Sequence, residues 1–210
     1  MSTNETLPNE TATPKTLLEL AGADLQPPRL NDAALVLIDF QNEYLSGPIE
    51  VAAPVPAIDA AARLLAAARD AGAPIFHIAH KGRPGGLFDR EAARGAIVEP
   101  LTPQPAEPVI EKGLPNAFAG TDLPERLTAT GRKELILAGF MTHMCVSSTA
   151  RAALDLGYRV SVDAASCGTR DLPDGLGGTL PAATVGQVAL AELADRFAVV
   201  VRDHDWRAPR

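Results

Sequence analysis

The sequence predicts an α/β protein built on one open, mostly parallel, six-stranded sheet with helices on both faces. Six short apolar runs, most of them rich in Val and Ile, have the length of strands. Their apolarity is continuous rather than alternating, which indicates burial on both faces and therefore a parallel sheet. Segments of helical periodicity and short connections separate most of the runs. The runs lie at residues 34–39, 74–79, 108–112, 134–139, 158–163 and 197–201.

Four helices are predicted between these runs. In the first, Ile58 and Leu65 share one apolar stripe, and Gly72 is placed to end the helix. The second is expected to begin at Asp122 as N-cap, because Glu125 follows three residues later as in a capping box. The remaining two helices are expected at about residues 143–156 and 181–196.

One domain accounts for residues 33–201, because the sequence shows no internal repeat and no second core. Residues 1–32 are rich in Pro, Thr and Asn, so we expect an arm that is poorly ordered or packs on a neighbouring subunit. Residues 202–210 form a C-terminal tail. Residues 80–107 are rich in Pro and Gly and too long for an ordinary connection, which predicts a loop over a functional site.

The composition argues against several classes of function. With 46% apolar and 21% charged residues, the chain is neither disordered nor fibrous. No apolar run approaches the roughly 18–20 residues that span a bilayer, and no secretory leader is recognisable, so we expect a cytoplasmic protein without membrane contact. The net charge of −7 and the lack of a dense basic cluster argue against nucleic acid as a partner. Cys145 and Cys167 are then expected to be free thiols.

Three polar residues stand where the predicted strands end or the next helix begins. In an open α/β sheet, ligands bind beyond the carboxyl ends of the strands. Asp39 closes the first run, Lys112 closes the third, and Cys145 follows the fourth. Each has an ordinary structural explanation by itself: a turn, a surface lysine and a buried small side chain. Their shared position instead favours one reactive site.

The chemistry of these three groups is complementary. With Thr142 as N-cap, Cys145 falls in the first turn of a helix, where the helix N-terminus and a nearby cation are expected to lower the pKa of the thiol. The carboxylate of Asp39 can accept the thiol proton and return it to a leaving amine, and Lys112 can hold the opposite charge over a thiolate. Backbone N–H groups around Cys145 can bind an oxyanion.

The segments VLIDFQNEY and GFMTHMCV, with Lys112 between them, resemble the isochorismatase-like cysteine hydrolases. This superfamily includes nicotinamidases, carbamoylsarcosine amidases and ureidoacrylate amidohydrolases, and the resemblance covers residues 33–201. It implies Cys145 as nucleophile, Asp39 as general base and acid, and Lys112 as third member of a catalytic triad. It also implies the strand order 3-2-1-4-5-6, a cis peptide after Phe140, and an oxyanion hole formed by the N–H groups of Met141 and Cys145.

Metal binding is not expected. Nicotinamidases of this superfamily hold a metal with an Asp-x-His pair and further histidines after the second strand. Here His77 and His80 are three residues apart and point to opposite faces of a strand, and no Asp-x-His follows. We therefore predict neither a metal nor another cofactor. His80 is interpreted as a substrate-pocket residue or a solvated loop residue, and His77 as packed within the sheet.

Four other residues are candidates for the substrate pocket. Phe40 and Phe118 flank the reactive residues and could be apolar walls, with core packing as the alternative. Tyr44 could line the mouth or belong to a turn. His143 precedes Cys145 by two residues, so at the start of a helix its side chain should point away from the thiol.

The sequence therefore predicts a hydrolase that cleaves a C–N bond of a small amide or ureido compound through a thioester, with that amide and water as its partners. An isochorismatase-type vinyl-ether hydrolase is a second possibility, in which Asp39 alone carries the reaction as an acid. A non-catalytic oligomeric binding or scaffold protein of the same fold is a third. A homo-oligomer, a dimer or tetramer, is usual for the family that the sequence resembles.

Overall fold

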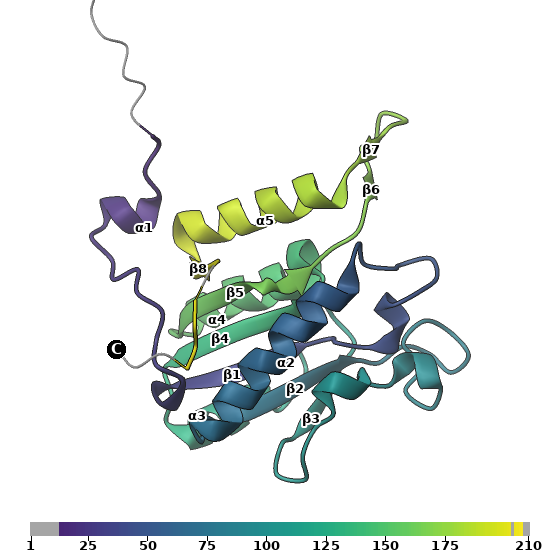
Figure 1. Ribbon diagram of the computed structural model, residues 1–210, viewed down its shortest axis with the longest axis horizontal. Helices are drawn as coiled ribbons and strands as arrows, with labels where there is room; N and C mark the ends of the chain where they lie inside the picture. Colours follow the sequence, from purple (N-terminus) through teal and green to yellow (C-terminus); the bar gives the residue numbers. More distant parts are fainter. Residues whose placement is uncertain (1–12, 203, 208–210) are drawn as a thin grey trace, which may run out of the picture.

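The computed structural model describes residues 13–202 and 204–207. Its centre is the parallel six-stranded sheet that the sequence predicts, in the order β3-β2-β1-β4-β5-β8 that the family resemblance implies (Figure 1). Each predicted apolar run overlaps one strand of this sheet, and β5 continues several residues beyond its run. The strands are β1 (Ala33–Ile38), β2 (Ile75–His80), β3 (Val109–Lys112), β4 (Glu134–Phe140), β5 (Arg159–Gly168) and β8 (Val199–Val201).

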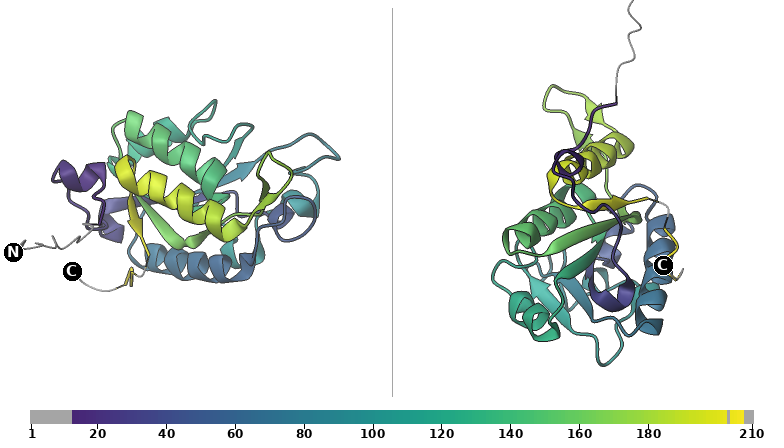
Figure 2. Two further views of the ribbon diagram at one scale, coloured as in Figure 1. Left: turned by 90° about the horizontal axis from the view of Figure 1, so that it is seen from above. Right: turned by 90° about the vertical axis from the view of Figure 1, so that its left-hand side faces the viewer.

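Helices cover both faces of the sheet, as Figure 2 shows from two sides. Alternate residues of β1 point to opposite faces, so Leu35 and Leu37 join the core under α2, and Val36 joins the core under the other helices. All six residues of β1 are buried, which explains its continuous apolarity. The main helices are α2 (Pro54–Asp70), α3 (Leu123–Thr130), α4 (Ser147–Asp155) and α5 (Ala182–Arg196).

Short elements complete the architecture. A small antiparallel hairpin stands away from the main sheet between β5 and α5 (Figure 1). It is the reason that the sixth strand of the sheet is the eighth in the chain. The short elements are α1 (Leu17–Leu20), the hairpin strands β6 (Leu172–Pro173) and β7 (Thr179–Leu180), and the 3₁₀ turns Leu30–Asp32, Asn42–Tyr44, Ala93–Gly95 and Glu99–Leu101.

The predicted capping box at the start of α3 is wrong. Asp122 occupies the N-cap position, but its side chain makes no capping hydrogen bond. Its carboxylate instead pairs with the guanidinium of Arg126, Nε to Oδ2 2.7 Å, one helical turn later. Pro124 stands in the first turn and has no N–H for a cap to bind, which reduces what a capping side chain could satisfy.

The N-terminal segment contacts its own chain where the structure describes it. A capping box of Thr16 and Glu19 starts α1, and the N–H of Leu17 donates to Asp195 Oδ1 of α5, 2.9 Å away. The sequence suggested a neighbouring subunit for this arm, and residues 1–12 lie outside the described residues. In the tail, Trp206 packs on the core under α2 and its indole N–H donates to Asp163.

No helix in the described part of the chain is long and apolar enough to cross a membrane.

Candidate active site

Asp39, Lys112 and Cys145 meet at the carboxyl edge of the sheet. Lys112 ends β3, Asp39 follows β1 directly, and Cys145 follows β4 within five residues. The ammonium nitrogen of Lys112 lies 2.7 Å from Asp39 Oδ2 and 3.3 Å from Cys145 Sγ. All three residues are buried, Cys145 being 4% exposed. The structure thus brings together the three residues that the sequence singled out, as one compact charged cluster.

Backbone geometry directs the Asp39 side chain. Its N–H still follows the sheet and donates to the carbonyl of Ile78 in β2, 2.9 Å away. Its φ of +53° is in the left-handed region, which ends the strand at that residue. Asp is among the few non-glycine residues that adopt this region readily. The change of direction leaves the carboxylate beyond the end of β1 and beside Lys112.

Cys145 lies in a π-helical turn, Thr142–Val146, that leads into α4. The Phe140–Met141 peptide before this turn is cis, as the family resemblance implies. The turn closes on itself because the N–H of Val146 donates to the carbonyl of Met141, 3.3 Å away. The thiol is therefore held on the first turn after β4, close to the position that the sequence predicts.

Two hydrogen bonds tie this turn to the end of β5. The hydroxyl of Thr142 donates to the carbonyl of Gly168 at 3.0 Å, and His143 Nδ1 lies 2.6 Å from the hydroxyl of Thr169. The prediction of Thr142 as a capping side chain is wrong, because the hydroxyl serves this tertiary contact and Met141 takes the N-cap position. His143 faces β5 and contacts Thr169, not the thiol.

Burial dominates the electrostatics of the cluster. It raises the pKa of Asp39, and the ammonium of Lys112 opposes that rise. Burial, together with the charge of Asp39, raises the pKa of Cys145 to about 12 although Lys112 acts in the other direction. The expectation of a lowered thiol pKa is therefore wrong, because desolvation and a neighbouring carboxylate outweigh the cation and the helix end. At neutral pH the resting site holds a thiol.

His80, the last residue of β2, extends the cluster towards solvent. Its Nδ1 lies 3.3 Å from Lys112 Nζ, and its ring is partly exposed. Burial and the nearby cation of Lys112 lower the pKa of His80, so the ring is neutral at neutral pH. Among the described residues, His80 is the pocket candidate that makes a hydrogen-bond contact with Lys112.

Aromatic rings form a continuous wall next to His80. Phe88 lies between His80 and Tyr44, with ring centroids 4.8 and 5.2 Å away. Tyr44 in turn packs on Phe140 at 5.6 Å, and Phe40 packs on the same ring at 4.8 Å. Burial raises the pKa of Tyr44, with Asp39 and Cys145 adding to the rise, so its hydroxyl keeps its proton. Phe40, Tyr44 and Phe140 all belong to the buried core cluster under α2, so the structure shows for Phe40 the core packing that the sequence left as the alternative.

Phe118 lies elsewhere. It stacks on Tyr158, with ring centroids 6.1 Å apart, in the core beneath α3 and α4. Tyr158 immediately precedes β5, so this contact belongs to the edge of the sheet opposite the reactive cluster. Cys145 belongs to the same core cluster, so Phe118 has the core packing that the sequence left as its alternative.

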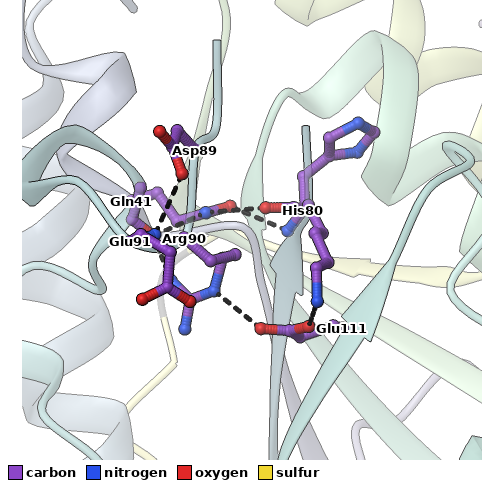
Figure 3. Close-up of polar contacts among 8 residues, drawn as sticks. Gln41, His80, Asp89, Arg90, Glu91 and Glu111 are labelled. Atoms are coloured by element: carbon purple, nitrogen blue, oxygen red, sulfur yellow. Dashed lines mark hydrogen bonds and ion pairs between the residues drawn. The ribbon is translucent and has the colours of Figure 1, made fainter. Parts of the chain in front are cut away.

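The loop of residues 81–107 is anchored next to the cluster by Gln41 (Figure 3). The side-chain amide of Gln41 donates to the carbonyls of His80 and Gly95, at 2.9 and 2.8 Å, and its oxygen accepts from the N–H of His80 at 2.8 Å. Arg90 of the loop binds the same Gly95 carbonyl and pairs with Glu111 of β3. In the sequence, Gln41 is the last residue of the Asp-Phe-Gln fragment within the segment that carries the family resemblance, which gave no sign of this anchoring role.

Glu43 is a second anchor of the loop. Its carboxylate is fully buried, pairs with Arg94 and accepts the N–H of Phe88 at 3.0 Å. No periodic pattern in the sequence indicates that the carboxylate of Glu43 is buried. Its effect is to hold the aromatic side chain of Phe88 against His80.

In the described residues, no group of three or more His, Cys, Asp or Glu side chains is arranged to hold a metal ion. His77 is buried and its Nε2 lies 3.0 Å from Glu107, which also pairs with Arg69 of α2. It thus packs within the sheet, as predicted.

Comparison with known proteins identifies the family. A sequence profile of the isochorismatase domain matches residues 33–205. A secreted isochorismatase effector of Verticillium dahliae is 38% identical over 83% of this chain and 90% of its own length. A maleamate amidohydrolase of Pseudomonas putida is 34% identical over 61% of this chain and 68% of its own length. The crystal structure of an isochorismatase from Pseudomonas putida KT2440 has a TM-score of 0.87 at 44% identity, covering 90% of this chain and 97% of that one. The chain belongs to the isochorismatase family of hydrolases.

Proposed function

We propose that this protein hydrolyses a C–N bond of a small amide or ureido compound through a thioester on Cys145. The observation that carries the proposal is the position of Lys112 Nζ, 2.7 Å from Asp39 and 3.3 Å from Cys145, inside a buried cluster. A carboxylate, a cation and a thiol in contact are the groups that nucleophilic acyl transfer needs. The amidohydrolase among the relatives supports a C–N bond as the target.

In the first half of the reaction, Asp39 removes the proton from Cys145 as Sγ attacks the substrate carbonyl. Because the resting thiol has a pKa of about 12, this transfer accompanies the attack and does not precede it. Lys112 stabilises the negative charge as it passes from the carboxylate oxygen of Asp39 to Sγ of Cys145. The C–N bond then breaks, Asp39 gives its proton to the leaving amine, and a thioester remains.

The tetrahedral intermediate carries a negative oxygen that needs N–H donors. The N–H of Met141 donates to no acceptor within the described residues, which leaves it available to this oxygen. We assign the oxyanion hole to the N–H groups of Met141 and Cys145.

In the second half, water replaces the amine. Asp39 takes a proton from the water as its oxygen attacks the thioester carbonyl. The C–S bond breaks, the carboxylic acid leaves, and the proton returns to Cys145. Protein groups and water supply every step, and the partly exposed His80 lines the place where the substrate enters.

The test is turnover of a small-amide library with intact-protein mass spectrometry. Cys145→Ala is expected to abolish turnover and the acyl adduct, because the nucleophile is gone. Cys167→Ser removes the other thiol, which is partly exposed at the end of β5, and is expected to retain both. Full activity of Cys145→Ala would contradict the thioester mechanism.

One observation favours the vinyl-ether alternative. Burial raises the pKa of Asp39, and a carboxylic acid that keeps its proton could protonate a vinyl-ether carbon directly. In that reaction Cys145→Ala would retain activity towards isochorismate and Asp39→Asn would not. The same pair of variants tests a non-catalytic role, since a scaffold protein would turn over neither class of substrate.

Two further properties are part of this proposal. A homo-oligomer, a dimer or tetramer, would cover exposed apolar side chains such as Leu176 and Val188, and light scattering that gives the monomer mass would contradict it. A cytoplasmic location would keep Cys145 reduced, and fractionation of the source cells tests it.

A further inference from the structure

Lys112 determines which nitrogen of His80 carries the proton. Three acceptors surround its Nζ: Asp39 Oδ2 at 2.7 Å, Cys145 Sγ at 3.3 Å and His80 Nδ1 at 3.3 Å. An ammonium group has three N–H bonds and no lone pair, so a ring nitrogen in hydrogen-bond contact with it has to accept. Since Nδ1 of His80 faces a donor, its lone pair is occupied there. The proton of the neutral ring is then on Nε2.

The neutral state of the ring has two independent supports. A protonated His80 would direct an Nδ1–H bond at the ammonium of Lys112 at 3.3 Å, which places two donors and two positive charges in contact. Burial also lowers the pKa of His80, with Lys112 as the second cause and Asp39 in opposition. The ring is therefore neutral, with one donor and one acceptor.

The direction of the Nε2–H bond of His80 is fixed before a substrate binds. Gln41 binds both the N–H and the carbonyl of His80, at 2.8 and 2.9 Å, so the backbone of the residue is clamped (Figure 3). Phe88 packs on the imidazole with centroids 4.8 Å apart. With Nδ1 on Lys112 and the ring against Phe88, Nε2 has one orientation.

His80 Nε2 has no acceptor within the described residues. The ring is partly exposed, whereas Asp39, Lys112 and Cys145 are buried. A molecule that enters the site from solvent therefore meets His80 next to Lys112, and meets it as a hydrogen-bond donor.

We propose that His80 presents Nε2–H to the substrate and selects small amides that carry a second oxygen acceptor, a carbonyl or a carboxylate, besides the scissile carbonyl. The proposal rests on the amide hydrolysis proposed above. An alkyl amide leaves this donor unpaired when it displaces water, and a site built to hydrogen-bond a substrate discriminates against a ligand that lacks the partner. The acceptor, charged or neutral, is the specificity element.

Matched substrates and matched variants test this on the full-length protein. The substrates are 3-oxobutanamide, 4-oxopentanamide and 5-oxohexanamide against the alkyl amides of equal length, with succinamic acid as the charged acceptor. His80→Asn keeps an acceptor for Lys112 at the place of Nδ1 but has no distal donor. His80→Gln can place an amide N–H where Nε2 was, but loses the acceptor for Lys112.

For at least one chain length, we expect the wild type to prefer the acceptor-bearing amide by about tenfold in kcat/KM, the worth of one hydrogen bond. His80→Asn should lose this preference through a higher KM for the acceptor-bearing substrate alone. His80→Gln should keep the preference and lower kcat for both substrates. A preference that survives in His80→Asn, or a wild type with no preference at any chain length, would overturn the proposal.

A second measurement needs no turnover. Long-range ¹H–¹⁵N correlation spectra of the protein should show His80 with a proton on Nε2 and none on Nδ1, the signal being assigned by its loss in His80→Asn. Titration of Cys145→Ala with 4-oxopentanamide should shift this Nε2 resonance, and pentanamide should not. If no amide is hydrolysed, the proposed function fails while these two readouts still decide the donor role. The opposite tautomer would refute it.

Discussion

Replacing Asp39 by Asn should make the thiol more acidic and the enzyme less active at the same time. Because Nζ of Lys112 lies 2.7 Å from Oδ2 and 3.3 Å from Sγ, the carboxylate and the sulfur are no more than about 6 Å apart. At an effective dielectric constant of about 20, two negative charges at that distance repel by about 3 kcal/mol, equal to a pKa change of about 2. Loss of the charge should therefore bring the pKa of Cys145 down from about 12 to about 10.

The expected consequences are opposite in sign. Below its pKa, the thiolate fraction of Cys145 should rise about 100-fold in Asp39→Asn. Amide turnover should fall about 10²- to 10⁴-fold, because the general base is lost. A mechanism that depended on a preformed thiolate would instead predict faster turnover in this variant.

The assay uses a Cys167→Ser background so that one thiol is observed. Thiolate absorbance near 240 nm is followed against pH, and the iodoacetamide rate and amide turnover are measured on the same preparations. Glu99→Gln, which neutralises an exposed carboxylate of the loop, is the matched control and should change neither quantity. The reasoning is refuted if Cys145 in Asp39→Asn titrates at or above the parental pKa, or if turnover is retained.

Two predictions concern stability. Gly139→Ala should destabilise the fold by about 3 kcal/mol or more in urea unfolding, because φ is +148° and a Cβ there would meet the Ile38 carbonyl at 2.1 Å. Gly113→Ala, with open space around the added carbon, is the control, and equal losses would contradict the packing argument. Burial raises the pKa of Glu107, but hydrogen bonds from Arg69, the Gln104 N–H and His77 together lower it from 4.5 to about 2. The difference in unfolding free energy between the wild type and Glu107→Gln should thus be largest above pH 4.5 and shrink as pH falls towards 2. A difference that does not change with pH would argue against this link between the Glu107 charge and stability.

Much of the fold follows from local pattern. Six apolar runs became the six strands of the sheet, since a buried parallel strand needs continuous apolarity and little else in the chain has it. The predictions were wrong where a polar side chain could bind either a group in its own helix turn or another partner. The capping expected of Asp122 and Thr142 was replaced by contacts with Arg126 and the Gly168 carbonyl. Local spacing carries no information about such competition.

The residues of the candidate site likewise fall into those that the sequence indicated and those that it did not. Residues that end strands, such as Asp39 and Lys112, were recognisable because parallel strands bring their carboxyl ends to one edge. For Phe118 the sequence left a pocket wall and core packing open, because its position in a connecting loop does not fix its direction, and the structure shows it packed on Tyr158. Gln41 and Glu43 anchor the loop from buried positions, and neither residue type nor spacing indicates that.

By itself, the sequence indicated six parallel strands, the edge at which chemistry takes place, and the meeting of a carboxylate, an ammonium and a thiol, and its family resemblance implied the strand order. Tertiary structure alone decided the protonation of these groups. The raised pKa of Cys145 and the Nε2–H form of His80 both depend on burial and on distances of about 3 Å to Lys112, which is more than 30 positions away from either residue. Desolvation and contact act through space. The sequence therefore determines which ionisable groups are present, and only the folded structure determines which of them are charged.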